Sequence, residues 1–236
     1  MIAIIGILAA LFLGGISRAM EAGRKTTCLN NLTQIGKGFR NYSEDNNDIL
    51  PRAGSSNVPE PNWANHIAVY MGLRPKDEDY VTNEQIGKSK MMLCPTAFRK
   101  HRSEIDSDTP LRSYGRNKHI KPLKRLAAAR LNPDTFYPEQ TYPTTLFEVP
   151  SKTLLVADGQ WGSNEWRKFF DNTAASDDET YIHTSDSING LFVDGHAERV
   201  LKRDVPIGET DNDEYYEDQD YSGRMFWQGI YEDPDA

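Results

Sequence analysis

The sequence predicts an α+β domain, because one long helical segment is followed by several short segments typical of strands. From Met1 to about Tyr42 the residues fit a single helix, and no proline occurs before Pro51. In the second half of the chain, Asp194-Gly195 stands between two apolar-rich runs. An Asp-Gly pair in that setting is a strong signal for a β-hairpin, since tight hairpin turns need positive φ.

The helical segment divides into two parts of different character. Residues 1–17 are apolar and uncharged, and Arg18 is the first charged residue. Residues 18–42 carry apolar side chains at helical spacing with polar ones between them, which is the pattern of an amphipathic helix. We therefore expect residues 1–17 to lie in a membrane or a filament core, and residues 18–42 to continue the same helix onto a globular body.

The apolar run taken alone fits neither a full membrane span nor a signal peptide well. A spanning helix needs roughly 20 apolar residues, slightly more than the run supplies. A secretory signal peptide begins with basic residues, and none precedes this run. A helix that starts in lipid and ends by packing on a protein body accounts for both halves of the segment.

Three further segments predict strands. Met91–Cys94 is expected to be a short strand that ends at a Cys-Pro pair. Residues 150–159 are expected to form a buried strand ending at the turn Asp158-Gly159. Leu191–Val193 and His196–Leu201 are expected to pair antiparallel through a type I′ turn.

The remaining sequence is predicted to form a globular body, residues 43–203, followed by an acidic and aromatic-rich segment, residues 204–236. Within the body, residues 63–70 place their apolar side chains on one helical face, and Gly72 is suited to end that helix. Residues 118–130 are locally basic and are interpreted as a solvated helix face.

The composition limits the classes of partner. The 236-residue chain has a formal net charge of −8, so a nucleic acid partner is not expected, because phosphate binding favours a basic surface. Its low mean hydropathy also excludes a membrane protein with many spans.

The two cysteines, Cys28 and Cys94, allow two interpretations. Neither belongs to a C-x-x-C pair, so a zinc knuckle or a thioredoxin-like site is not indicated. In an oxidising compartment the pair is a candidate disulfide, and otherwise both residues are buried thiols. The spacing leaves both possibilities open.

Several motifs together resemble those of type IV pilin-like proteins, in particular the pseudopilin-like family common in planctomycetes. The start of the chain is similar to the apolar stem of these proteins, and a C-x-x-N-L-x-Q-I-G pattern with a following tyrosine continues it. Later matches are Cys-Pro, Ser-Tyr-Gly-x-Asn, Leu-x-x-Asp-Gly, and a histidine followed by N-x-L-F-x-D-G-H. In this sequence they are Cys28–Gly36, Tyr42, Cys94-Pro95, Ser113–Asn117, Leu155–Gly159, His183 and Asn189–His196.

The resemblance implies a pilin-like fold, in which the second half of the long helix packs on a small antiparallel sheet with loop-rich insertions. It also implies a structural, non-enzymatic subunit of a helical filament, with a role in type II-like secretion, adhesion or motility. Residues 2–16 would anchor the subunit in the bacterial inner membrane before assembly, with the body in the periplasm or at the cell surface. The implied partners are copies of the chain, other pilins or pseudopilins, and inner-membrane assembly proteins.

The family's leader, processing site and early glutamate do not occur in this sequence, which begins within the apolar helix. We expect them to lie upstream of the residues given.

Four residues are candidate metal ligands: Asp158, His183, Asp194 and His196. Two carboxylates and two imidazoles suit a divalent ion, and Ca²⁺ is the cofactor to consider. A hydrolytic His–Asp pair is a weaker alternative, and no G-x-S-x-G nucleophile motif accompanies it. The favoured interpretation is structural, because an aspartate before a turn glycine accepts backbone N–H bonds and His183 can bond across to the hairpin.

Two other functions remain open at this point. A membrane-anchored extracellular glycan-binding protein would use exposed Trp161 and Trp166 to stack on sugar faces. A secreted metal-dependent hydrolase would use the four candidate ligands.

Overall fold

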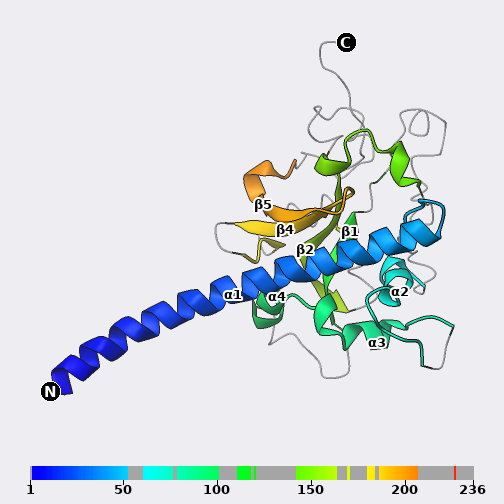
Figure 1. Cartoon of the computed structure of the whole chain (residues 1–236). Coiled ribbons are helices and arrows are strands. Elements are labelled where there is room, and N and C mark those ends of the chain that lie inside the picture. Colours follow the sequence, from blue (N-terminus) through cyan, green and yellow to red (C-terminus); the bar gives the residue numbers. More distant parts are fainter. Residues whose placement is uncertain are drawn as a thin grey trace, which may run out of the picture.

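The computed structural model describes residues 2–52, 61–76, 79–100, 111–117, 120, 142–163, 169–170, 180–183, 186–206 and 226. For residues 2–15, 17, 111–112, 160–163 and 169–170 it describes only the backbone. Within these residues the chain is an α+β structure with one long helix and one small sheet, as the sequence predicts (Figure 1).

Helix α1, Ile2–Asp45, is a single uninterrupted helix of 44 residues. At about 1.5 Å per residue it is about 66 Å long. Its first half projects away from the body, and its second half lies across the sheet (Figure 1). The expected long helix is thus confirmed, and it ends three residues beyond Tyr42, where Asn47 and Asp48 adopt positive φ of 55° and 59°.

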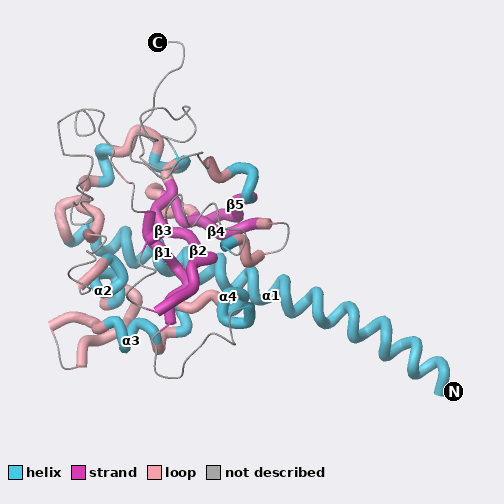
Figure 2. Tube along the Cα trace, turned by 180° about the vertical axis from the view of Figure 1, so that it is seen from behind, coloured by secondary structure: helices cyan, strands magenta, loops and turns pink. Residues whose placement is uncertain are grey.

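The second half of α1 packs through one apolar stripe. Cys28, Leu32, Ile35 and Phe39 recur three or four residues apart and are at most 3% exposed. Residues at that spacing lie on one helical face, so α1 covers one face of the sheet (Figure 2).

The sheet is small and mostly antiparallel. Its order is β3-β1-β2-β4-β5, and only the β1–β3 pair is parallel. The strands are β1 Leu111–Asn117, β2 Leu154–Ser163, β3 Phe169–Phe170, β4 Ser187–Phe192 and β5 Ala197–Leu201.

Strands β4 and β5 form the hairpin expected around Asp194-Gly195, with Leu191 opposite Ala197. The prediction of a type I′ turn is wrong. Such a turn needs positive φ at both central residues, and Gly195 has φ of +90° while Asp194 is not among the positive-φ residues. The Gly195 N–H donates to the Phe192 carbonyl at 2.9 Å. The Phe192 N–H donates to the His196 carbonyl at 2.9 Å, so three residues lie between this hydrogen-bonded pair, as in a type I turn followed by a left-handed glycine.

Two other strand predictions need correction. Strand β2 does not end at Asp158-Gly159 but runs through this pair to Ser163. Gly159 adopts φ of +94° inside the strand, and a Cβ there would lie 2.2 Å from the Thr180 carbonyl oxygen. The glycine therefore serves a close approach of two backbone segments.

The predicted strand Met91–Cys94 is instead a 3₁₀ turn, Lys90–Met92, followed by extended Leu93. The Asn31 side-chain amide donates to the carbonyls of Lys90 and Leu93, at 3.2 and 3.1 Å. These carbonyls bond to α1 rather than to a neighbouring strand, which explains the difference.

The described part of the body also has three short α-helices: α2 Trp63–Ala68, α3 Asn83–Gly87 and α4 Pro95–Lys100. Helix α2 lies within the predicted helix 63–70, and Gly72 has the expected positive φ, 84°. The ring of Trp63 stacks on that of Phe39 at 5.5 Å between centroids, which joins α2 to α1.

Some expectations fall outside the described residues. Most of the basic segment 118–130 and nearly all of the acidic segment 204–236 are among the residues left undescribed. A search of the described helices finds none that is long and apolar enough to cross a membrane. The side chains of residues 2–15, which make up most of the apolar run, are not described.

Candidate functional site

The body contains a buried disulfide between Cys28 of α1 and Cys94, which directly precedes α4. The two Cα atoms are 4.8 Å apart, and both residues are 0% exposed. This geometry decides between the two interpretations that the spacing left open. The bond fixes the long helix covalently to the body.

A cluster of three polar side chains lies beside this disulfide. We call Asp158, His183 and Asn189 the buried polar cluster; Asp158 comes from β2 and Asn189 from β4, while His183 precedes β4. The side chains of Asp158 and His183 are 0% exposed. The cluster therefore lies inside the protein, between the sheet and α1.

The carboxylate of Asp158 is the centre of the cluster. Its Oδ1 accepts the backbone N–H of Asn189 at 2.8 Å, and its Oδ2 accepts the Asn189 side-chain amide at 2.8 Å. The Nε2 atom of His183 lies 2.8 Å from the same Oδ2. A buried carboxylate with these contacts has its acceptor sites satisfied.

The tautomer of His183 follows from its neighbours. Nε2 lies 2.8 Å from Asp158 Oδ2 and 2.9 Å from Asn189 Nδ2, whereas Nδ1 is buried without a hydrogen-bond partner. A proton on Nε2 is donated to the Asp158 carboxylate and leaves only a lone pair unpaired on Nδ1, and the Asn189 amide then donates to Asp158 alone. We therefore assign the Nε2–H tautomer from the contact with Asp158.

The cluster contacts the disulfide directly. Cys94 Sγ lies 3.8 Å from Asp158 Oδ2 and 3.9 Å from His183 Nε2. On the other side of the bond, the Tyr114 hydroxyl donates to the Cys28 carbonyl at 3.3 Å. Burial raises the pKa of Tyr114 well above its ordinary value, and the Asp158 charge raises it further, so the phenol stays protonated as a donor.

The structure separates the four predicted metal ligands into two pairs. Asp158 and His183 are joined in the buried polar cluster. Asp194 and His196 lie at the β4–β5 turn and are more than a third exposed. The Asp194 carboxylate accepts the His196 backbone N–H at 3.1 Å, which is the structural role expected of an aspartate before a turn glycine.

Sequence reasoning did not assign Asn189 and the two cysteines to the same site as Asp158 and His183. Asn189 was visible as the first residue of N-x-L-F-x-D-G-H, but its side chain points to Asp158 rather than into the hairpin turn. Among the described residues, the four with ligand atoms within 4.8 Å of one another are Cys28, Cys94, Asp158 and His183.

Arg116 is a buried ionisable group outside the buried polar cluster and is 2% exposed. Burial lowers its pKa to about 10. Its guanidinium donates to the Pro51 carbonyl, which ties β1 to the segment that follows α1.

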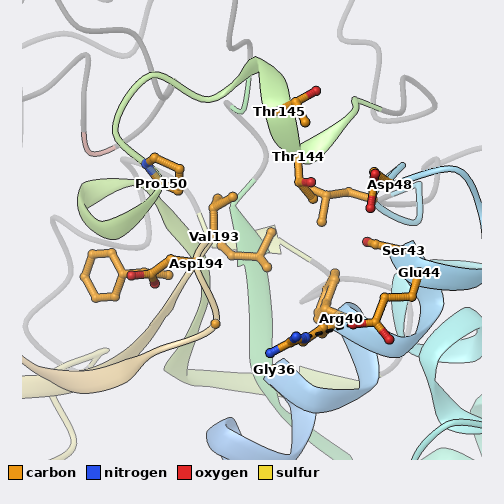
Figure 3. Close-up of a pocket in the computed structure, with 15 residues that line it drawn as sticks. Gly36, Arg40, Ser43, Glu44, Asp48, Thr144, Thr145, Pro150, Val193 and Asp194 are labelled. Carbon is orange, nitrogen blue, oxygen red and sulfur yellow. Dashed lines mark hydrogen bonds and ion pairs between the residues drawn. The ribbon is translucent and has the colours of Figure 1, made fainter.

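A groove of about 450 Å³ lies at the seam between α1 and the β4–β5 turn (Figure 3). Apolar, hydroxyl-bearing and charged residues all line it. The hydroxyl of Ser43 is buried there without a hydrogen-bond partner. The lining residues are Gly36, Phe39, Arg40, Ser43, Glu44, Asp48, Leu50, Thr144, Thr145, Pro150, Leu155, Phe192, Val193, Asp194 and Gly195.

Comparison of the chain with protein-family models, with curated proteins and with solved structures gives no match. The pilin resemblance therefore stays a prediction from the sequence motifs.

Proposed function

We propose that this chain is a structural subunit of a pilin-type filament, assembled through the first half of α1. The observation that carries the proposal is that one continuous helix, Ile2–Asp45, is half packed on the body and half projecting from it (Figure 1). The projecting half contains the apolar residues 2–16. A long apolar helix that projects from its own body is suited to pack against helices of other subunits.

The described side chains nearest the projecting half support this role. Ile16 is 49% exposed and Met20 is 53% exposed, and they lie four residues apart on one face of α1. They follow the apolar sequence 2–15 along α1 toward the body. A neighbouring subunit's helix packed along this face would cover both side chains.

The attachment of α1 to the body suits a subunit that bears load. Besides the disulfide at Cys28, α1 approaches the hairpin so closely that a Cβ on Gly36 would lie 2.8 Å from Leu191 and 3.2 Å from the Gly195 carbonyl oxygen. Force applied to the projecting half would reach the segment before α4 through a covalent bond and the β4–β5 hairpin through a tightly packed contact.

Before assembly, we propose, residues 2–16 hold the subunit in the bacterial inner membrane, with the body in the periplasm and later at the cell surface. An oxidising compartment of that kind is where structural disulfides persist, and the Cys28–Cys94 bond is consistent with it. The proposed partners are copies of this chain, other pilins or pseudopilins, and membrane assembly proteins. The filament would serve type II-like secretion, adhesion or motility.

The hydrolase alternative gains no support from the buried polar cluster. A substrate would have to reach Asp158 and His183, whose side chains are both 0% exposed. For the glycan-binding alternative, the side chains of Trp161 and Trp166 lie outside the described residues.

Charge substitutions test the proposed assembly surface. Met20→Asp should abolish or shorten filaments in electron micrographs of cells producing the variant, because a carboxylate would be buried between helices. Val69→Asp is the matched control, since Val69 is 51% exposed but lies on the body at the end of α2. Normal filaments from Met20→Asp would argue against this surface, as would equal loss from Val69→Asp.

A further inference from the structure

We propose that the reduced form of this chain binds one Zn²⁺ ion through Cys28, Cys94, Asp158 and His183. The ligand atoms of these four residues all lie within 4.8 Å of one another, and all four residues are buried. The disulfide occupies the place where the metal would bind, so the two states exclude each other. This inference is independent of the filament proposal.

The distances from Cys94 Sγ to Asp158 and His183 are close to those of a tetrahedral zinc site, and reduction of the disulfide lets the two sulfurs move apart to the same spacing. Zinc–sulfur bonds of about 2.3 Å and zinc–nitrogen or zinc–oxygen bonds of about 2.0–2.2 Å place neighbouring ligands roughly 3.3–3.8 Å apart. Cys94 Sγ already lies 3.8 Å from Asp158 Oδ2 and 3.9 Å from His183 Nε2. Nε2 and Oδ2, now 2.8 Å apart, need to separate by about half an ångström to admit the ion.

The ligand types select zinc over calcium. Calcium takes six to eight oxygen ligands, and this site offers two sulfurs, one imidazole nitrogen and a carboxylate. Two thiolates with an imidazole and a carboxylate form a four-coordinate set suited to Zn²⁺. The Ca²⁺ considered from the sequence is therefore not the ion that this cluster favours.

Charge provides the driving force for binding. Reduction leaves two thiols beside a buried carboxylate, and ionising them without a cation would be costly in this environment. A divalent ion compensates two thiolates, so binding and thiol ionisation occur together. Because the site is closed, the ion must enter as the chain folds, and its binding free energy becomes folding free energy.

The chemistry balances with a thiol as reductant. Two molecules of a small thiol reduce the Cys28–Cys94 bond to two thiols and leave as one disulfide. Zn²⁺ then replaces the two thiol protons, which pass to solvent. Oxidation of the two thiolates by a disulfide oxidant re-forms the Cys28–Cys94 bond and releases the ion.

Asn189 already orients the Asp158 carboxylate. Its backbone N–H donates to Asp158 Oδ1 at 2.8 Å, which holds the carboxylate before metal arrives. Its side-chain amide lies 2.8 Å from Oδ2 and 2.9 Å from His183 Nε2 and must turn away from both atoms when the ion binds. Zinc on Nε2 requires the ring proton of His183 on Nδ1. The disulfide and zinc forms therefore differ in histidine tautomer.

Cobalt substitution tests the site directly. The full chain is kept in mild detergent throughout. It is first unfolded and reduced with a phosphine, and it is then refolded in the presence of Co²⁺. We expect one Co²⁺ per chain with sulfur-to-cobalt charge-transfer absorption that Zn²⁺ abolishes, and none in the disulfide form. Absence of this absorption from the reduced chain would overturn the proposal, as would equal binding by the oxidised chain.

Variants identify the ligands. Asp158→Asn should lower the Co²⁺ affinity of the reduced chain by more than about tenfold. Loss of a group that only hydrogen-bonds to a metal ligand already lowers metal affinity by about that factor. Asp194→Asn is the matched control and should leave the affinity unchanged. Equal affinities in the two variants would exclude Asp158 as a ligand.

Two measurements on the unmodified chain cover the case in which Asp158→Asn fails to fold. The ¹¹³Cd NMR shift of the cadmium-loaded reduced chain should report two thiolate ligands. The ¹⁵N shifts of His183 should show a proton on Nε2 in the disulfide form and on Nδ1 in the metal form. A cadmium shift without thiolate ligation, or an unchanged tautomer, would contradict the site.

Discussion

His183 Nε2 lies 2.8 Å from Asp158 Oδ2, and both side chains are fully buried beside the Cys28–Cys94 disulfide. Asn189 donates two further hydrogen bonds to the same carboxylate. The contact joins β2 to the segment before β4, directly beneath α1. It gives a physical reason for Leu-x-x-Asp-Gly, the histidine and N-x-L-F-x-D-G-H to occur together in one chain.

Asp158→Asn should destabilise the disulfide form by about 3 kcal/mol. One carboxylate oxygen becomes an NH₂ donor, which then faces the donors of His183 and Asn189 inside the protein. Urea unfolding followed by circular dichroism measures the change. Asp194→Asn, at an exposed turn, should cost less than about 1 kcal/mol. A similar loss in the two variants would mean that the buried polar cluster contributes no special stability.

Removing the disulfide should also be costly. Cys28 and Cys94 are 66 residues apart, and closing a loop of this size in the unfolded chain is worth about 4 kcal/mol in the chain-entropy model. The Cys28→Ala, Cys94→Ala double variant should lose stability of that order in urea unfolding. Mass spectrometry of the wild-type chain first establishes that the disulfide is formed. If it is formed and the double variant is equally stable, the role assigned to the bond is contradicted.

Three glycine-to-alanine substitutions should change the free energy of unfolding by clearly different amounts. Gly159→Ala should cost at least about 3 kcal/mol, because its Cβ would lie 2.2 Å from the Thr180 carbonyl oxygen at a positive φ. Gly195→Ala meets no atom within 4 Å and should cost about 1 kcal/mol for its positive φ alone. Gly23→Ala, exposed in α1, should stabilise by about 0.5–1 kcal/mol. Thermal unfolding of the three variants gives the order, and a tolerated Gly159→Ala would show that the close approach is absent.

His66 should make the protein less stable in mild acid. Burial lowers the pKa of His66 below 6.5, and the charges of Arg52 and Arg116 lower it further. Well above pH 6.5 the residue is neutral in both states. As the pH falls through 6.5 the unfolded chain binds the proton first, so stability decreases until the pH is below the lowered pKa of the folded state. His66→Gln should therefore lose less stability than wild type between pH 7.5 and 5. Identical pH dependence in both proteins would rule out this contribution.

The local patterns predicted the parts of the fold that depend on neighbouring residues. The periodic apolar stripe at Cys28, Leu32, Ile35 and Phe39 predicted the packed half of α1, and Asp194-Gly195 predicted the hairpin. The residues that make up each signal lie close together in the chain, so local interactions determine both features.

The errors arose where distant segments decide the structure. Asn31 bonds to the carbonyls around Met92 and converts a predicted strand into a 3₁₀ turn. The approach of Thr180 to Gly159 allows β2 to continue where a turn was expected. No local pattern around Met92 or Gly159 records these long-range contacts.

The candidate site shows the same division. The sequence identified Asp158, His183, Asp194 and His196 by residue type, but could not show that the last two lie apart at an exposed turn. It also could not show that the cysteines lie beside Asp158, because the disulfide links residues 66 positions apart. The buried polar cluster therefore required the fold.

Electron microscopy of material sheared from cells that make this chain tests the central proposal most directly, using an antibody against the globular body. The proposal predicts thin filaments labelled along their length, which disappear in cells making Met20→Asp and persist with Val69→Asp. Label found only on membrane fragments or on single subunits, with no labelled filament, would contradict a filament subunit.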